Sequence, residues 1–513
     1  MSLCRMRSFS VTSFWVLSIV AALLVSCRSR LPRQEESERL PKREFRGAWI
    51  QTVYQSEYAQ LGSEGASALL EKRIRALHRA GCNAVIFQVR PESDAFYASS
   101  VEPWSRFLTG TQGVAPSPYW DPLNMAIELC HSLGMELHAW INPYRASTSA
   151  TAVLAPNHPA CINPEWFVNY NGQLYYNPAY PECRAHIRRV VKDLVLRYDI
   201  DALHIDDYFY PYPVAGLTFP DQASFERLGL VEGYRPEQIG DWRRDNVNKL
   251  IRDIRTTINE CKPWVRFGVS PFGIYRNKRS TQDGSGSRTS GLQNYDDLYA
   301  DVLLWDREKN IDYLVPQLYW PIGHKAADFG ELAPWWNRHT EQDTHLYFGI
   351  DVKKTMQEGQ LSRKLSLMRE YADGIVYWPA GEVVNNTGGI ADSLRLRHQH
   401  SLSLIPSDPR HRHKVPKVKG LVQQAYDGGI RLSWEDTSDQ YDPVRPQFYV
   451  VYLIPKGQKV SIDNPEYIVY VGPYAELKLP SSLGRGRKYT CLVTALDRFR
   501  NESKPVKVKL KIR

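Results

Sequence analysis

Between residues 45 and 400, short apolar runs alternate eight times with longer amphipathic segments. Gly81 and Gly134 each end such a segment just before the next apolar run, where glycine commonly terminates a helix. This pattern predicts a TIM (β/α)8 barrel with long inserted loops, and a doubly wound open sheet is the alternative. The strands are expected at 45–53, 83–90, 135–142, 200–206, 265–271, 311–319, 345–351 and 374–378, with helices such as 65–80, 121–133, 183–198 and 241–260 between them.

Polar and aromatic residues follow the expected strands, where the active-site loops of such a barrel begin. The chain has 14 Trp and 30 Tyr, and flat rings at a barrel mouth can stack on sugars, although some of them will instead pack in the core. The candidate substrate-binding residues at or beside the strand ends are Trp49, Gln88, Arg90, Asp94, His138, Trp140, Asn142, Tyr144, Arg145, His204, Tyr208, Tyr210, Tyr275, Gln317, Tyr319, Trp320, Trp378 and Glu382.

The apolar run 200–205 ends in two adjacent carboxylates, Asp206 and Asp207, followed by tyrosines and prolines. Two neighbouring carboxylates among aromatic rings are poised for different pKa values, as acid–base chemistry on a sugar requires. A turn that only caps the next helix is the alternative. Because neighbouring strand residues point to opposite sides, we expect Asp206 to face the barrel axis with His204, and Asp207 to emerge at the loop.

If the pair acts on a glycosidic bond, the common mechanism needs a second carboxylate opposite the first. Glu92, Asp94, Asp351 and Glu382 are candidates, and Glu92 and Asp351 join Asp206 and Asp207 as the expected catalytic set. For an N-acetylated sugar another route exists, in which the substrate's own acetamide attacks and an acidic pair on the fourth strand orients and protonates.

Several charged candidates have a functional and a structural interpretation. Arg90 and Arg145 can hold a substrate carboxylate or can simply neutralise acids at the barrel mouth. His138 and His204 lie inside strands and can be hydrogen-bonded core histidines.

Seven motifs are spread over the first 400 residues: Phe45–Trp49, Gln88–Pro91, Glu102–Ser105, His138–Arg145, His204–Pro211, Val269–Gly273 and Pro316–Trp320. Together they resemble the glycosyl hydrolase-like 10 family of bacterial surface lipoproteins. The resemblance covers about residues 43–400 in collinear order and implies a TIM-barrel glycoside hydrolase. One enzyme of this kind cleaves peptidoglycan glycan strands that have lost their stem peptides, so the resemblance implies such a glycan as substrate.

Residues 1–27 have the pattern of a targeting sequence. Arg5 and Arg7 precede an apolar stretch that ends in Leu24-Val25-Ser26-Cys27. This resembles a bacterial lipoprotein signal, which implies lipidation of Cys27 and an anchor in the outer membrane; an uncleaved helix or an ordinary secretory signal is the alternative. Residues 28–42 are expected to form a flexible tether.

Six further cysteines follow the targeting sequence. Cys161 and Cys183 bracket a loop that a disulfide would stabilise, and an oxidising compartment permits one. Cys82 and Cys130 lie in apolar contexts and are expected to be buried thiols. No CxxC or HExxH spacing occurs, so we expect no metal site and no cofactor.

After residue 400 the pattern changes to short alternating segments. Residues 401–416 have the composition of a linker, and residues 417–513 predict an immunoglobulin-like β-sandwich that folds independently. Leu432–Trp434 and Tyr489–Ser503 resemble a fibronectin type III module. The barrel domain is therefore expected to span residues 43–400.

The formal charge of +9 is spread over the sequence without a basic block, so nucleic acid is not an expected partner. The expected function is hydrolysis of a cell-envelope glycan by a protein that is monomeric and lipid-anchored. A non-catalytic glycan-binding or scaffold lipoprotein is the competing hypothesis. The many acids at the strand ends favour the enzyme, because a binding site has less need of them.

Overall fold

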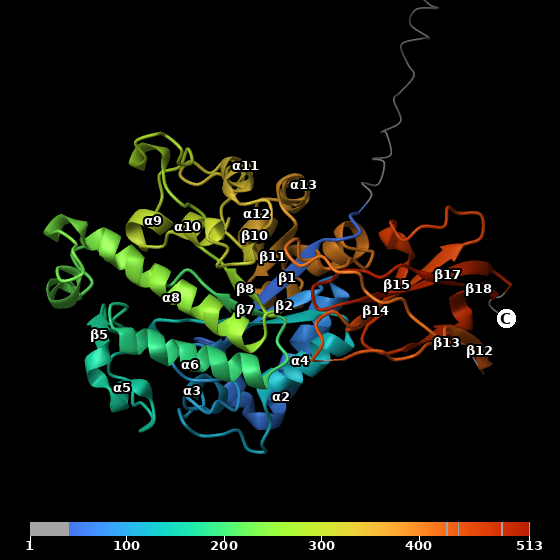
Figure 1. Ribbon diagram of the computed structural model, residues 1–513, viewed down its shortest axis with the longest axis horizontal. Coiled ribbons are helices and arrows are strands. Elements are labelled where there is room, and N and C mark those ends of the chain that lie inside the picture. Colours follow the sequence, from blue (N-terminus) through green and yellow to red (C-terminus); the bar gives the residue numbers. More distant parts are fainter. Residues whose placement is uncertain (1–39, 427–428, 440, 484–485, 512–513) are drawn as a thin grey trace, which may run out of the picture. The chain divides into compact units, whose positions relative to one another are not determined.

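The computed structural model describes residues 40–426, 429–439, 441–483 and 486–511, and the described residues from Pro41 onward form one compact unit (Figure 1). The expected targeting sequence, the lipidation site Cys27 and all of the expected tether before residue 40 lie outside the described residues. Within the described ranges, no helix has both the length and the apolar character that crossing a membrane requires.

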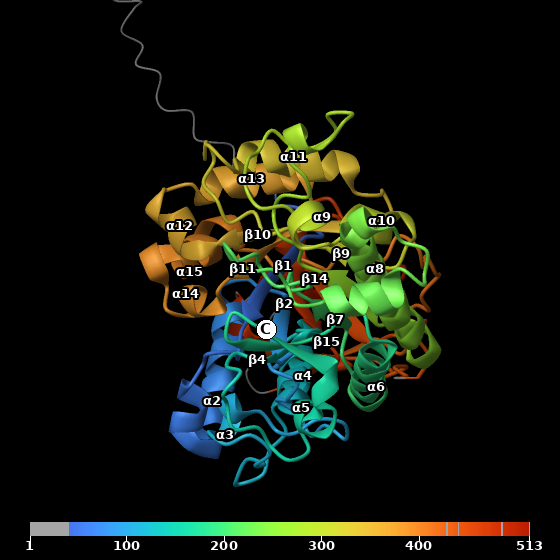
Figure 2. The same ribbon diagram turned by 90° about the vertical axis from the view of Figure 1, so that its left-hand side faces the viewer.

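Eight parallel strands close into a barrel in the order β1-β11-β10-β9-β8-β7-β3-β2. This confirms the predicted TIM barrel, and each expected strand occurs. Helices surround the strands and bury their outer faces (Figure 2). The barrel strands are β1 (Phe45–Ile50), β2 (Ala84–Arg90), β3 (Glu136–Ile141), β7 (Ala202–Ile205), β8 (Arg266–Val269), β9 (Tyr313–Leu314), β10 (His345–Asp351) and β11 (Gly374–Trp378).

The helices form where the amphipathic segments predict them. In α4, for example, the Asp121 side chain caps the backbone N–H groups of Leu123 and Asn124, and Pro122 occupies the first turn, where its missing N–H costs nothing. The longer helices are α2 (Glu57–Arg79), α4 (Pro122–Ser132), α6 (Pro181–Arg197), α8 (Ile239–Cys261), α11 (Phe329–His339) and α13 (Leu361–Tyr371). Shorter ones are α3 (Arg106–Thr109), α5 (Pro159–Ile162), α7 (Gln222–Ser224), α9 (Asn294–Asp297), α10 (Val302–Arg307), α12 (Val352–Gln357), α14 (Ala380–Val384) and α15 (Ile390–Ser393).

Aromatic side chains fill the lower half of the barrel. The rings of Phe45 and Tyr347 stack with centroids 4.1 Å apart. Gly268 on β8 is required here, because a Cβ at this position would lie 1.9 Å from the Tyr313 ring. The interior is therefore a packed core at this level.

A small antiparallel sheet is inserted after β3. It has the order β4-β6-β5 and comprises β4 (Arg145–Ser147), β5 (Phe167–Tyr170) and β6 (Gln173–Tyr176). This sheet follows directly from the C-terminal end of β3, so Arg145 enters it at the barrel mouth.

Two antiparallel sheets follow the barrel, with the orders β12-β13-β16 and β15-β14-β17-β18. Leu432 of the first sheet and Val451 of the second belong to one hydrophobic core, which gives the predicted sandwich. The likeness to a fibronectin type III module stays a prediction. The strands are β12 (Val422–Tyr426), β13 (Gly429–Ser433), β14 (Phe448–Pro455), β15 (Ile468–Gly472), β16 (Glu476–Pro480), β17 (Lys488–Leu496) and β18 (Val506–Lys511).

The sandwich and the preceding linker both contact the N-terminal end of the barrel. The Arg500 guanidinium donates to Glu136 at the start of β3 at 2.6 Å and to Asp201 just before β7 at 2.8 Å. Arg410, in the expected linker, pairs with Asp312 just before β9 at 3.2 Å. The segment 401–416 is thus tied to the barrel, and independent folding of 417–513 stays a prediction.

The cysteines of the described residues are free thiols. The disulfide considered between Cys161 and Cys183 is therefore wrong: Cys161 is exposed on α5, whereas the Cys183 thiol is buried on α6 and donates to the carbonyl of Trp166 at 3.7 Å. Cys82 and Cys130 are buried, as their apolar contexts predicted.

Candidate active site

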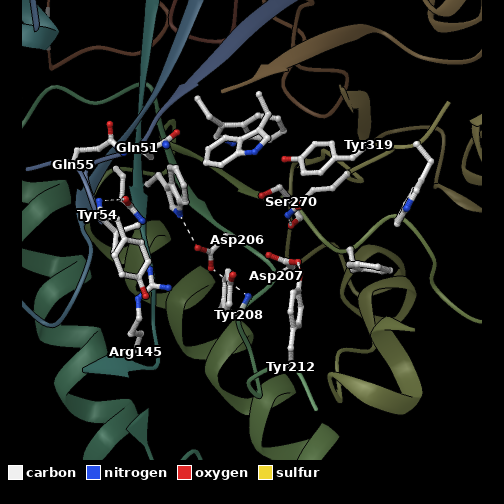
Figure 3. A pocket seen from close by; sticks show the side chains of 18 residues that line it. Gln51, Tyr54, Gln55, Arg145, Asp206, Asp207, Tyr208, Tyr212, Ser270 and Tyr319 are labelled. Atoms are coloured by element: carbon white, nitrogen blue, oxygen red, sulfur yellow. Dashed lines mark hydrogen bonds between the residues drawn. The ribbon is translucent and has the colours of Figure 1, made fainter. Parts of the chain in front are cut away.

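A cavity of about 350 Å3 opens at the C-terminal end of the barrel strands (Figure 3). Its size and its mixture of rings with a few polar groups are typical of small-molecule sites. Both adjacent aspartates contribute to its wall. The lining residues are Trp49, Gln51, Val53, Tyr54, Gln55, Gln88, Trp140, Arg145, Asp206, Asp207, Tyr208, Tyr212, Ser270, Phe272, Gln317, Tyr319, Trp320 and Trp378.

The Asp206 carboxylate is held by donors from β3 and from its own loop. Its oxygens accept from Trp140 Nε1 at 3.1 Å, from Asn142 Nδ2 at 3.0 and 3.2 Å, and from the backbone N–H of Tyr208 at 3.3 Å. Asn142 is itself fixed, because its side-chain oxygen accepts from the backbone N–H of Arg145 at 2.7 Å. These bonds fix the orientation of Asp206 and favour its ionised form.

Asp207 also faces the cavity, which corrects the expectation that only Asp206 does so. Strand β7 ends at Ile205, so the alternation of side chains along a strand no longer governs Asp207. The Tyr212 hydroxyl donates to the Asp207 carboxylate, and Figure 3 shows the two carboxyl groups side by side at the cavity wall.

Burial raises the pKa of both carboxyl groups. The pKa of Asp207 rises to about 7, because burial and then the neighbouring Asp206 charge outweigh the hydrogen bonds from Tyr212 and Gln317. For Asp206, burial raises the pKa, while the Arg145 charge and the hydrogen bonds from Asn142 oppose the rise. Asp207 is therefore the better proton donor near neutral pH, with Asp206 as the charged partner.

Indole and phenol rings form the upper wall of the cavity. Trp378 lies edge-on to Trp49 and Trp140, with ring centroids 6.3 and 6.2 Å apart, and Tyr319 meets Trp49 at 6.5 Å. These residues come from four different strand ends, so aromatic side chains line the mouth on several sides. Their faces provide apolar surface against which a sugar ring can stack.

Arg145 is the one cation among the described residues that line the cavity. Its Nε donates to the carbonyl of Pro91 at 3.0 Å, and its guanidinium carbon lies 5.2 Å from the centroid of the Tyr208 ring. These contacts orient the guanidinium toward the cavity, next to Asp206 (Figure 3).

Glu92 and Asp351, the other two expected catalytic acids, do not line this cavity. Both Glu92 oxygens accept from Arg106, each at 2.8 Å. Asp351 caps α12 by accepting from the backbone N–H of Lys354 at 2.8 Å. Both carboxylates are therefore used in structural contacts outside the cavity.

Four further candidates lie below or beside the cavity. Arg90 forms a fully buried pair with Glu102 at 2.7 Å. His138 bonds Glu136 at 3.0 Å, and His204 bonds the Ser270 hydroxyl at 3.0 Å, so both are hydrogen-bonded core histidines. Asp94 is buried, accepts from Gln112 at 3.0 Å, and has its pKa raised to about 7, first by burial and then by Glu92.

The remaining candidates are also outside the cavity. Tyr144 and Tyr210 are buried in the main core. The Tyr275 hydroxyl donates to Asp301 at 2.8 Å. Glu382, on α14, lines a neighbouring depression that shares Trp49 with the main cavity.

Several lining residues were not among the candidates. The adjoining loop after β1 contributes Gln51, Val53, Tyr54 and Gln55, and later loops contribute Tyr212, Ser270 and Phe272. Their position just after predicted strands places them near the barrel mouth. The loop conformation, which the sequence does not show, decides which of these side chains point into the cavity. Among the described residues, no group of three or more His, Cys, Asp or Glu side chains is placed to hold a metal ion.

A closed parallel barrel with a carboxylate pair in an aromatic cavity at its C-terminal end is characteristic of a glycoside hydrolase. Comparison of the sequence with protein families gives the same class. The profile described as glycosyl hydrolase-like 10 matches residues 44–364, and the chain belongs to this family. It is thus a glycoside hydrolase.

Two relatives have named activities of the same class. Glycosyl hydrolase YngK of Bacillus subtilis is 35% identical over 519 residues, covering 97% of this chain and 98% of the relative. Glycosyl hydrolase DigH of Escherichia coli K12 is 31% identical over 394 residues, covering 70% and 88%. A solved glycoside hydrolase domain, that of PgaB (BpsB) from Bordetella bronchiseptica, has 12% identity and a TM-score of 0.45, covering 70% of this chain and 99% of that one.

Proposed function

We propose that this glycoside hydrolase cleaves a cell-envelope glycan, namely peptidoglycan glycan strands that lack stem peptides. The observation that carries the proposal is the cavity itself, where a carboxyl group with a pKa of about 7, Asp207, faces aromatic walls beside a single cation, Arg145. A protonated carboxyl can protonate the leaving glycosidic oxygen, and the rings can bind the sugar faces.

Arg145 supports a glycan that carries carboxylates. N-acetylmuramic acid without its peptide ends in a free lactyl carboxylate, and a guanidinium can bind such a group through two parallel hydrogen bonds. The Arg145 Nε is already bonded to Pro91, so the outer nitrogens are the ones that would meet the lactyl group. A stem peptide would convert this carboxylate to an amide and remove its charge.

The proposed location agrees with this substrate. The lipobox-like sequence that ends at Cys27 supports a lipid anchor in the bacterial envelope, at the outer membrane, where peptidoglycan is accessible. Labelling cells with a fatty-acid analogue tests the anchor: the wild-type protein should take up the label and Cys27→Ala should not.

Incubation of the mature protein with three glycans tests the activity: peptide-free strands, peptide-bearing peptidoglycan and chitin oligomers. Products are measured by mass spectrometry and by new reducing ends. We expect the peptide-free strands to be shortened fastest. Binding of the strands without new reducing ends would instead indicate the non-catalytic, glycan-binding alternative and would overturn the proposal.

A further inference from the structure

The cavity contains only two carboxyl groups among its described lining residues, and both lie on the same loop. A glycosidase with an enzymic nucleophile or base needs two carboxyl groups on opposite sides of the scissile bond, roughly 5 Å apart for retention and about 6.5–9.5 Å apart for inversion. Asp206 and Asp207 are consecutive residues, so they approach the sugar from one side. The rest of the described lining holds no carboxyl group and includes the rings of Trp49, Tyr319 and Trp378.

The two carboxyl groups also differ in how they are held. Asp206 receives hydrogen bonds from Trp140, Asn142 and the backbone of Tyr208, a set that orients a negatively charged acceptor. Asp207 receives hydrogen bonds from the side chains of Tyr212 and Gln317. Asp206 is therefore suited to accept a hydrogen bond from a substrate N–H group, and Asp207 is suited to exchange a proton.

We propose that the missing nucleophile is supplied by the substrate, and that the sugar whose C1 is attacked must carry a 2-acetamido group. The inference rests on the proposed function and deepens it, because it restricts cleavage to bonds of N-acetylated sugars. Asp206 holds the acetamide N–H and turns its carbonyl oxygen toward C1. The Trp140 ring, which donates to Asp206, and the Trp378 ring beside it enclose the acetamide and exclude water during this step.

In the first step the acetamide oxygen forms a bond to C1 as the bond from C1 to the leaving oxygen breaks. The proton of Asp207 passes to that oxygen, and the resulting oxazolinium ring is stabilised by the Asp206 carboxylate. In the second step water bonds to C1, the bond from C1 to the acetamide oxygen breaks, and the Asp207 carboxylate takes the proton from water. The net reaction is hydrolysis with retention at C1, because C1 is inverted twice.

The test uses peptide-free glycan strands that have been de-N-acetylated and then N-acylated again, with acetyl groups or with trifluoroacetyl groups. Fluorine makes the carbonyl oxygen a weak nucleophile with little change in size. We expect kcat on trifluoroacetylated strands to fall at least about 10²-fold, because a positioned internal nucleophile supplies a large part of the rate. The re-acetylated strands are the matched control and should be cleaved at the native rate.

Equal rates on the two re-acylated strands, or an inverted configuration at C1 seen by NMR, would overturn the inference while leaving the proposed function intact. Failure of the wild-type enzyme to cleave even native or re-acetylated strands would overturn both.

Two variants separate the roles of the aspartates. With an aryl glycoside of N-acetylglucosamine that has a good leaving group, the first step no longer needs an acid. Asp207→Asn should therefore form the intermediate at close to the wild-type rate, seen as a burst of released phenol. In Asp206→Asn the rate constant of phenol release in the first step should fall by about 10²- to 10⁴-fold, the usual effect of losing a group that acts on a proton in the transition state. A burst that survives in Asp206→Asn would contradict the assigned role.

Discussion

Arg500 of the C-terminal sandwich donates to the fully buried Glu136 at the floor of the catalytic barrel, at 2.6 Å. Glu136 also pairs with Arg266 of β8, and its pKa is held well below the ordinary value because these arginine charges outweigh its burial. The sandwich therefore completes a charge cluster inside the barrel domain, and its attachment matters for stability.

The first prediction concerns this contact. Arg500→Ala leaves a buried carboxylate without one of its partners and should reduce the free energy of unfolding by about 3 kcal/mol in urea titrations. Arg431→Ala is a matched control in the same sandwich, because Arg431 pairs with Glu476 on an exposed surface and should cost less than about 1 kcal/mol. Equal losses for the two variants would show that the Arg500–Glu136 contact stabilises the protein no more than an exposed ion pair does.

A second prediction follows from the pKa of Asp207 and concerns stability. Burial and Asp206 raise this pKa from 3.8 to about 7, so the contribution of the group to stability is fully present below pH 3.8 and is lost as the pH rises through 7. Asp207→Asn avoids ionisation and should exceed the wild type in stability by up to about 4 kcal/mol above pH 8. The difference should shrink steadily toward pH 5, and a difference independent of pH would contradict the assignment.

A third prediction concerns the pH dependence of kcat. The groups around Asp207 are Asp206, which raises its pKa, and the side chains of Tyr212 and Gln317, which lower it; Arg145, Tyr208 and Tyr319 share the same cavity. Because the acid must be protonated, kcat should decline as the pH rises through about 7. Tyr212→Phe removes a hydrogen bond that lowers the pKa, so this decline should move to higher pH. A shift to lower pH, or no shift, would argue against Asp207 as the acid.

A fourth prediction addresses the carboxylate of the substrate. Arg145→Ala should raise KM on strands with free lactyl groups by about tenfold, the lower range for loss of a charge-assisted hydrogen bond of roughly 1.5 kcal/mol. Arg145→Lys keeps the charge but cannot form two parallel hydrogen bonds, so its KM should lie between the values of the wild type and of Arg145→Ala. The control substrate is a chitin oligomer, which has no carboxylate. If Arg145→Ala raised KM on this oligomer as much as on the strands, Arg145 would not be binding the lactyl group.

The barrel and the acidic pair could be predicted from sequence because both depend on local patterns. Strands such as Ala84–Arg90 are buried on both faces, so the length and apolar character of the run are sufficient to predict the strand. The position of the two carboxylates at the barrel mouth could be predicted in the same way, because the C-terminal ends of all strands of a parallel barrel lie at one mouth.

Other features depend on contacts that the linear sequence does not display. Glu92 had the same residue type and strand-end position as a catalytic acid, but Arg106, from the next helix, neutralises it. Asp351 caps a helix that begins directly at its strand. The orientation of Asp207 depends on where β7 ends, and one residue of difference in that boundary reverses the side on which a side chain is expected.

The most direct test of the catalytic assignment compares kcat of Asp207→Asn and Asp351→Asn on peptide-free glycan strands. Asparagine caps a helix about as well as aspartate, so Asp351→Asn should retain the wild-type rate. Asp207→Asn should lose about 10²- to 10⁴-fold, the usual contribution of a general acid, while its circular dichroism stays unchanged. Wild-type turnover by Asp207→Asn, or an equal loss in both variants, would contradict the account of Asp207 as the acid that cleaves the glycan.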